Sequence, residues 1–186
     1  MLTNEKSMIQ KLVMTAMMMC LIMVMTFIIR IPVPATQGYI HLGDCMIFLG
    51  VLLLGWKYGA VAAGVGSALA DLWGGYVIYA PITLVVKAAM AISVGLFVQW
   101  ALKGGLSAMK LCIMEIIGMI IGGAIMCAGY YLAEGFMVGN WVAPLAAIPM
   151  NIIQFVVGVF LATILVNALY KTPARKMFAY HLDTVQ

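Results

Sequence analysis

The sequence has little charge. Only 9% of its 186 residues are Asp, Glu, Lys or Arg, whereas 66% are hydrophobic and the mean hydropathy is +1.13. A soluble domain of this length must present a largely polar exterior, which this composition does not supply. We therefore expect residues 1–186 to form a single integral-membrane domain, with no room for a separate soluble domain.

Motifs for catalysis and nucleotide binding are also absent. The nearest approach to a phosphate-binding loop, residues 50–57, has Trp56 before Lys57 where the motif requires glycine, and neither HExxH nor GxSxG occurs. The cysteines show no CxxC spacing, so we interpret them as small buried hydrophobes rather than as metal ligands or a disulfide. We expect no enzyme, no cofactor and no metal site, and the dispersed basic residues do not form a nucleic-acid footprint.

Long apolar segments, divided by Pro, Gly and charged residues, predict an all-α membrane protein. A spanning helix needs about 20 mostly apolar residues, so the length allows about six spans. The first segment exceeds the usual signal-peptide core and is followed by Pro32 and Pro34 rather than a cleavage site, so we expect a retained helix. The predicted spans are 8–30, 44–55, 60–75, 81–102, 108–132 and 144–170.

The basic residues are distributed unequally between the two sides of this six-helix arrangement. Arg30 alone falls on one side, and Lys87 falls inside a span. The side that holds both termini carries Lys6, Lys11, Lys57, Lys103, Lys110, Lys171, Arg175 and Lys176. Because Lys and Arg accumulate in cytoplasmic loops, we expect both termini to lie in the cytoplasm, in a multi-pass protein of the cell membrane.

Polar side chains recur at helical spacing inside three spans. The pairs are Ser67 with Asp71, Thr83 with Lys87, and Asn151 with Gln154. At 1.5 Å per residue, the ionisable and amide groups reach similar depths of roughly 8 to 15 Å below the outer surface. An ion pair between Asp71 and Lys87 would lower the cost of burying either charge. The common depth favours a polar pocket in the outer half of the membrane.

Aromatic residues of the outer loops are the second part of the predicted site. Tyr39, His41, Tyr76, Tyr79 and Trp141 map to the outer side, either as an interfacial belt or as ligand contacts. The longest loop, 34–43, mixes glycine with aromatic residues and leads into Asp44, which is typical of a mobile lid. Asp44 either caps the second helix or contacts the ligand. Glu115, in the cytoplasmic half of the fifth span, has no assigned role.

Five short fragments along the chain carry a recognisable pattern. They are 38–44 (GYIHLGD), 53–60 (LLGWKYGA), 66–72 (GSALADL), 79–81 (YAP) with Lys87, and 149–151 (PMN) with Gln154. In this order they resemble the substrate-binding S components of energy-coupling factor (ECF) vitamin transporters. The similarity is greatest to the subunits for hydroxymethylpyrimidine or vitamin B6, with the riboflavin subunits as relatives.

The resemblance implies a six-helix fold that captures a vitamin from outside and docks on a transmembrane T component driven by two cytoplasmic ATPases. The family's docking motif, Ala-x-x-x-Ala in the first helix, corresponds here to Ala16 and Cys20. We expect a small heteroaromatic vitamin of the pyridoxine or hydroxymethylpyrimidine class; a riboflavin-type S component, a stand-alone transporter or channel, and an assembly subunit are the alternatives. The expected vitamin contacts are Tyr39, His41, Asp71, Tyr76, Tyr79, Lys87, Asn151 and Gln154.

Overall fold

The structure, a computed structural model, describes residues 2–33, 38–105 and 107–180. Within these residues it is an all-helical bundle with one short antiparallel hairpin, and five helices are long and apolar enough to cross a membrane, where the sequence predicted six spans. The elements are α1 (Leu2–Ile28), β1 (Arg30–Val33), β2 (Gly38–His41), α2 (Gly43–Trp73), α3 (Ala80–Leu102), α4 (Ala108–Val138), η1 (Ala143–Ala147), α5 (Ile148–Tyr170) and η2 (Pro173–Met177).

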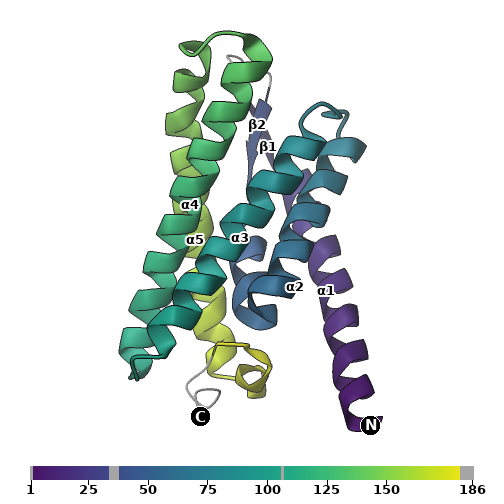
Figure 1. Cartoon of the computed structure of the whole chain (residues 1–186), viewed down its shortest axis with the longest axis vertical. Helices are drawn as coiled ribbons and strands as arrows, with labels where there is room; N and C mark the ends of the chain where they lie inside the picture. The colour runs from purple at the N-terminus through teal and green to yellow at the C-terminus, as the bar shows by residue number, and fades with distance from the viewer. Residues whose placement is uncertain (1, 34–37, 106, 181–186) are drawn as a thin grey trace.

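The difference in helix number lies in α2, which is interrupted at Gly55. Gly55 has φ +80° and ψ 169°, a conformation essentially restricted to glycine. A Cβ atom on Gly59 would lie 2.8 Å from the Cα atom of Val51, whereas residues eight apart in a continuous helix are about 12 Å apart. The two legs, 43–54 and 56–73, therefore fold back on each other (Figure 1). They correspond to the two short spans expected at 44–55 and 60–75.

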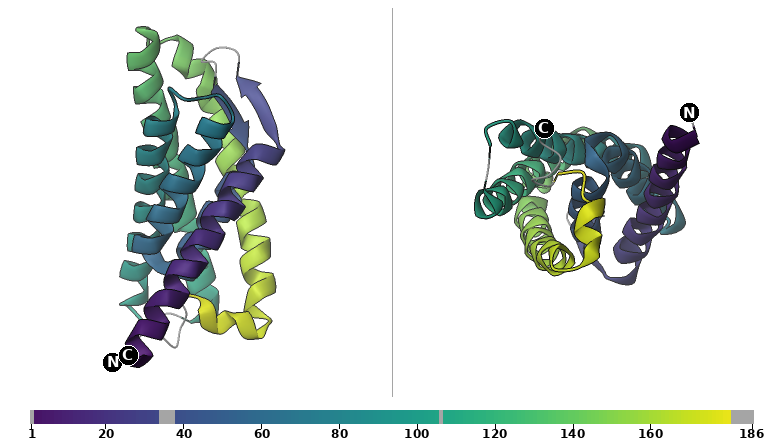
Figure 2. Two further views of the ribbon diagram at one scale, coloured as in Figure 1. Left: turned by 90° about the vertical axis from the view of Figure 1, so that its right-hand side faces the viewer. Right: turned by 90° about the horizontal axis from the view of Figure 1, so that it is seen from below.

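The helices run roughly along the long axis of the molecule, with both termini at one end (Figure 1). We call this the terminal end, and it also carries the turn of α2 and the turn between α3 and α4. The opposite end, the hairpin end, carries the β-hairpin, the α2–α3 connection and the α4–α5 connection. Helix α1 runs obliquely along the outside of the bundle (Figure 2).

The main hydrophobic core lies between the first leg of α2 and helices α3 and α4. Its fully buried members include Phe48 and Leu52 of α2, Met90 and Val94 of α3, and Met119 of α4. Gly122 allows the close approach of α4 to α3, because a Cβ there would lie 2.5 Å from the Val94 side chain. Small residues at this contact bring helix backbones together, as expected for packing in lipid.

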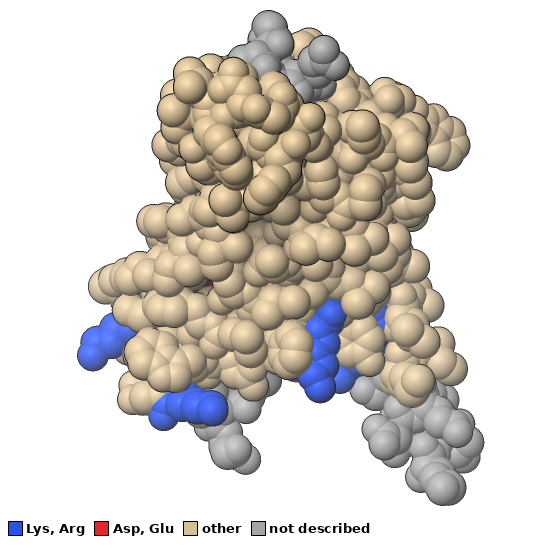
Figure 3. Space-filling model, turned by 45° about the horizontal axis from the view of Figure 1, so that its top comes forward, with Lys and Arg blue, Asp and Glu red and all other residues tan. Residues whose placement is uncertain are grey.

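The charged surface differs between the two ends. On the face shown in Figure 3, basic side chains gather towards the lower part of the molecule, and no acidic side chain is visible. At the terminal end, Lys57 comes just after the break in α2, and Lys103 and Lys171 directly follow the last residues of α3 and α5. The basic asymmetry read from the sequence therefore has a counterpart in the arrangement of the chain.

Two sequence predictions about the hairpin end were wrong. The stretch 34–43 was expected to be a loop, but residues 38–41 form β2, which pairs with β1 in the register Arg30 with His41 and Pro32 with Tyr39. Pairing satisfies the backbone groups of both strands next to the apolar bundle. Residues 34–37 lie outside the described part of the chain. Helix α4 also continues to Val138, beyond the expected end at 132.

The C-terminal segment folds back over the break in α2. A regular helix would join the Trp56 N–H to the Leu52 carbonyl, and the break at Gly55 separates them. Instead, the Trp56 N–H donates to the Tyr180 hydroxyl at 2.8 Å, and the Leu52 carbonyl accepts from the Ala179 N–H at 3.0 Å. Tyr180 is 5% exposed, so the segment after η2 supplies buried partners for both groups.

We expect Tyr180→Phe to lower the free energy of unfolding by about 1–2 kcal/mol, because it leaves the Trp56 N–H without its acceptor. The matched control is Tyr58→Phe, which removes a hydroxyl near the same turn and touches neither bond. Thermal or denaturant unfolding in detergent measures the difference. Equal stability of the two variants would show that the tail does not hold the break.

Candidate functional site

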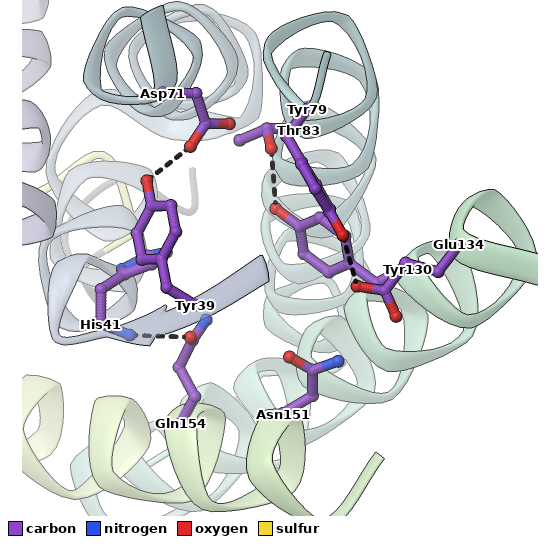
Figure 4. A pocket seen from close by; sticks show the side chains of 9 residues that line it. All are labelled: Tyr39, His41, Asp71, Tyr79, Thr83, Tyr130, Glu134, Asn151 and Gln154. Atoms are coloured by element: carbon purple, nitrogen blue, oxygen red, sulfur yellow. Dashed lines mark hydrogen bonds between the residues drawn. The ribbon is translucent and has the colours of Figure 1, made fainter. Parts of the chain in front are cut away.

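A pocket lies at the hairpin end, where β2 and the four helices α2 to α5 meet (Figure 4). It contains about 360 Å³ of empty space, and this volume includes the open space at its mouth. Every lining residue carries a polar group, and three carry a phenol ring. The lining residues are Tyr39, His41, Asp71, Tyr79, Thr83, Tyr130, Glu134, Asn151 and Gln154.

Six of the eight predicted vitamin contacts line this pocket, and two do not. The six are Tyr39, His41, Asp71, Tyr79, Asn151 and Gln154. Tyr76 instead packs on the Tyr39 ring, with 4.5 Å between ring centroids. Lys87 is fully buried and is absent from the lining. Trp141, expected near the mouth, packs against Tyr131 and Phe136.

Lys87 pairs with Asp44, and the expected ion pair with Asp71 was a wrong prediction. The Lys87 Nζ lies 2.5 Å from Asp44 Oδ1, and both side chains are fully buried. Asp44 sits in the first turn of α2 but does not cap it, since Leu42 is the N-cap residue. Asp71 accepts a hydrogen bond from the Tyr39 hydroxyl instead. The partner of Asp71 is therefore Tyr39 of β2, whereas Lys87 of α3 had been expected.

Gln154 links this ion pair to the floor of the pocket. Its amide donates to Asp44 Oδ2 at 2.8 Å and accepts from the backbone N–H of His41 at 2.9 Å. Lys87 also lies 2.9 Å from the sulfur of Met126 on α4. The network formed by Asp44, Lys87, Gln154 and His41 thus connects β2, α2, α3 and α5. Removing one charge would leave the other buried without a counter-charge.

We expect Lys87→Met to destabilise the protein by about 3–5 kcal/mol, because Asp44 then stays buried without its cation. The double variant Asp44→Asn/Lys87→Met should recover part of the loss, since the amide is neutral. Unfolding in detergent measures both. If the double variant is less stable than Lys87→Met alone, the ion pair is not the cause of the loss.

His41 is held as a neutral ring. The Gly43 N–H donates to its Nδ1 atom at 2.9 Å, which leaves the proton of the neutral ring on Nε2. Burial, reinforced by the nearby Lys87 charge and opposed by Asp44, lowers the pKa of His41 to about 3. Gly43 is required for this contact, because a Cβ atom there would lie 2.9 Å from the same nitrogen. The ring therefore faces the pocket without charge at neutral pH.

This lowered pKa predicts a loss of stability in mild acid. Below pH 6.5 the unfolded state binds a proton at His41 that the folded state does not bind, so the free energy of unfolding falls as the pH falls. Between pH 6.5 and 5 the loss should be about 2 kcal/mol. His41→Gln should reduce this dependence, and His181→Gln, outside the described residues, should retain it. Identical pH profiles of thermal unfolding in His41→Gln and His181→Gln would contradict the assignment.

Two carboxylates and two tyrosines form pairs across the pocket (Figure 4). On one wall the Tyr39 hydroxyl donates to Asp71 at 2.5 Å, and on another the Tyr79 hydroxyl donates to Glu134 at 3.4 Å. Between them, the Tyr130 hydroxyl donates to Thr83 at 3.1 Å. Both carboxylates are buried, with exposures of 3% for Asp71 and 4% for Glu134.

Three lining residues were missed as site residues in the sequence: Thr83, Tyr130 and Glu134. Glu134 was assigned to a loop because the fifth span was ended at residue 132, before the helix ends. Tyr130 and Glu134 are four residues apart, so they share a face of α4 once the helix is extended. The four-residue spacing of Tyr130 and Glu134 was therefore the sequence signal that could have placed both residues in the site.

Arg30 approaches the site from behind. Its guanidinium lies 5.0 Å from the centre of the Tyr39 ring and donates to the carbonyl of Ala70. It is absent from the pocket lining.

At the other end of the bundle, Glu115 is buried and accepts from the Tyr170 hydroxyl at 2.6 Å, which gives this residue a structural partner. Ala16 and Cys20 lie on an exposed face of α1.

The family model of the ECF-type riboflavin transporter S component matches residues 6–171. The chain belongs to this family. It is therefore an S component, the substrate-binding subunit for vitamin uptake that works with a T component and ATPases, and it is not an enzyme. A solved structure of the S component of a bacterial ECF transporter shares its fold, with a TM-score of 0.65 over 87% of this chain and 96% of that chain at 20% identity.

Two curated relatives match this S component. An uncharacterized protein of Pyrococcus woesei is 38% identical over 138 residues, which are 74% of this chain and 86% of the relative. The thiamine precursor transporter HmpT of Lactococcus lactis is 26% identical over 166 residues, which are 88% of this chain and 90% of HmpT. The expected family is therefore confirmed, whereas the vitamin B6 type is not established by these similarities.

Proposed function

We propose that this S component captures a small heteroaromatic vitamin, of the pyridoxine or hydroxymethylpyrimidine class, from outside the cell. The observation that carries the proposal is the pocket at the hairpin end, whose phenol rings suit stacking on a flat ring. The side chains of Asp71, Glu134, Asn151 and Gln154 supply polar groups for the ring's edges. The similarity to HmpT supports the thiamine-precursor side of this class.

The proposed topology has six crossings, with both termini in the cytoplasm. It treats each leg of α2 as one crossing, so the hairpin end with its pocket faces outside. The supporting observation is the basic terminal end, since Lys57, Lys103 and Lys171 lie there and Arg30 begins β1 at the other end. An outward pocket is what a capture step requires.

The exposed face of α1 is the proposed docking surface for the T component. Ala16 and Cys20 are both exposed and small, so they permit close approach of another helix. Larger side chains flank them, including Met17 at 61% and Leu21 at 44% exposure.

Titration calorimetry on the purified protein in detergent tests the vitamin class. We expect Asn151→Ala to weaken binding of pyridoxine or hydroxymethylpyrimidine by about tenfold or more, because it removes a buried polar contact. The matched control, Asn167→Ala, removes an exposed asparagine of the same helix and should leave affinity unchanged.

Two results would contradict the proposal. Binding of neither compound by the wild-type protein would exclude this vitamin class, and unaltered affinity in Asn151→Ala would exclude the pocket. Tight binding of riboflavin alone would favour the second candidate, a riboflavin-type S component, which the description of the matched family favours. Vitamin uptake into vesicles by the chain without ATPases would favour a stand-alone transporter.

A further inference from the structure

A second pocket lies beside the break in α2, towards the terminal end of the bundle (Figure 1). It encloses about 510 Å³ of empty space, again counted with its open mouth. Three helices and the C-terminal segment form its wall: Lys11 comes from α1, residues 54–58 from α2, Gln99 from α3, and Tyr180 from the segment after η2. None of these residues lines the pocket at the hairpin end.

Two lysines on different helices line this second pocket, and neither pairs with a carboxylate of the described residues. Lys11 and Lys57 are both exposed, and the Lys57 Nζ lies 5.3 Å from the centre of the Trp56 ring. The lining contains no Asp or Glu. In this half of the described chain, Glu115 is 2% exposed and accepts from the Tyr170 hydroxyl, so it does not balance the lysines. The pocket therefore has an uncompensated positive charge.

The break at Gly55 adds to this charge, because a helix starts there. The second leg of α2 begins after Gly55, and its first residues, 56–58, belong to the lining. The N-terminal end of a helix carries a partial positive charge and favours anions, phosphate among them. The Trp56 N–H is already bonded to the Tyr180 hydroxyl, so this end acts through its dipole rather than through that amide.

Tyr180 brings a buried hydrogen-bond donor to the same pocket. Its side chain is 5% exposed, and its oxygen accepts from the Trp56 N–H at 2.8 Å. A phenol hydroxyl also has a proton to donate, and the hydrogen bonds of the described residues give this proton no acceptor. A buried donor without an acceptor costs free energy. An anionic oxygen in the pocket would accept from it.

Apolar surface adjoins the pocket on the side of the membrane interior. Leu96, three residues before Gln99 on α3, is 45% exposed, and Val61, three residues after Tyr58 on α2, is 49% exposed. Both lie further from the terminal end than the lining residues of their own helices (Figure 1). Trp56 and Tyr58 are residue types that favour the membrane–water interface. An anion that carries acyl chains therefore meets apolar contacts beside the lysines.

We propose that this pocket binds the phosphate group of an anionic phospholipid, with Lys11 and Lys57 contacting the phosphate oxygens. The acyl chains lie on the exposed apolar surface of α2 and α3. Basic pockets between membrane helices bind anionic headgroups through such charges. A free phosphate ester has the same anionic group but gains nothing from the apolar surface. The bound lipid links α1 to the start of the second leg of α2, at the end opposite to the proposed vitamin pocket.

The first test compares lipids on the full chain in detergent by native mass spectrometry. The probes are phosphatidylglycerol and phosphatidylcholine with the same acyl chains, and inorganic phosphate and glycerol 3-phosphate are the competitors. We expect the first phosphatidylglycerol to bind at least tenfold more tightly than phosphatidylcholine, whose choline cation the lysines repel. Equal binding of the two lipids would overturn the recognition of an anion. Displacement of phosphatidylglycerol by an equal concentration of either competitor would assign the pocket to free phosphate and overturn the lipid.

The second test is the double variant Lys11→Gln/Lys57→Gln. We expect its affinity for phosphatidylglycerol to fall about tenfold to thirtyfold, roughly fivefold for each lysine, with phosphatidylcholine binding unchanged. The matched control is Lys103→Gln/Lys171→Gln, which removes two lysines at the same end of the molecule and outside the lining. Its affinity should equal that of the wild type. The same loss in both double variants would show a general attraction to the basic end and would overturn the pocket.

Thermal unfolding of both double variants separates lipid binding from folding. Lys11 and Lys57 are exposed, so we expect the variant that lacks them to stay folded. If it does not fold, Lys11→Gln alone decides the inference, with an expected loss of about fivefold in affinity for phosphatidylglycerol. Unchanged affinity in that folded single variant would overturn the proposal.

Discussion

The buried pair of Asp44 and Lys87 is the interaction on which the rest of the site depends. Two fully buried charges in an apolar bundle are tolerated only if they meet each other and if their remaining hydrogen-bonding positions are filled. Gln154 fills one position on Asp44, and the same amide accepts from the backbone of His41. Satisfying one ion pair thereby fixes where β2 sits relative to α5, and β2 carries Tyr39 and His41 of the pocket.

The pocket lies next to this network, and its lining residues come from elements that are far apart in the sequence. The β-hairpin, the second leg of α2, the start of α3, the end of α4 and the start of α5 all reach the hairpin end. The hydroxyls of Tyr39 and Tyr79 bond to the buried carboxylates of Asp71 and Glu134, and the hydroxyl of Tyr130 bonds to Thr83, so a hydrogen bond orients each phenol ring of the pocket. A subunit that binds a small ring tightly needs such preorganised groups, because ordering them on binding would reduce affinity.

The opposite end of the bundle is closed by the protein's own C-terminal segment. The break at Gly55 creates two backbone groups that a continuous helix would have paired, and Ala179 and Tyr180 pair them. At the terminal end, Ala179 and Tyr180 stabilise the turn between the two legs of α2, and towards the hairpin end the ion pair of Asp44 holds the start of the first leg. The same break lets α2 contribute Asp44 from its first leg and Asp71 from its second leg to one end of the molecule.

The sequence by itself determined the membrane class and most of the helical segments, because apolar length and helical spacing are local properties. It also predicted six residues that line the pocket, from their polar or aromatic character at the outer ends of the spans: Tyr39, His41, Asp71, Tyr79, Asn151 and Gln154. Only the tertiary structure decided that Lys87 pairs with Asp44 rather than Asp71, that residues 38–41 form a strand, and that Glu134 faces the pocket. These outcomes depend on which elements are neighbours in space, because a buried charge can pair with a residue of any element that lies close to it.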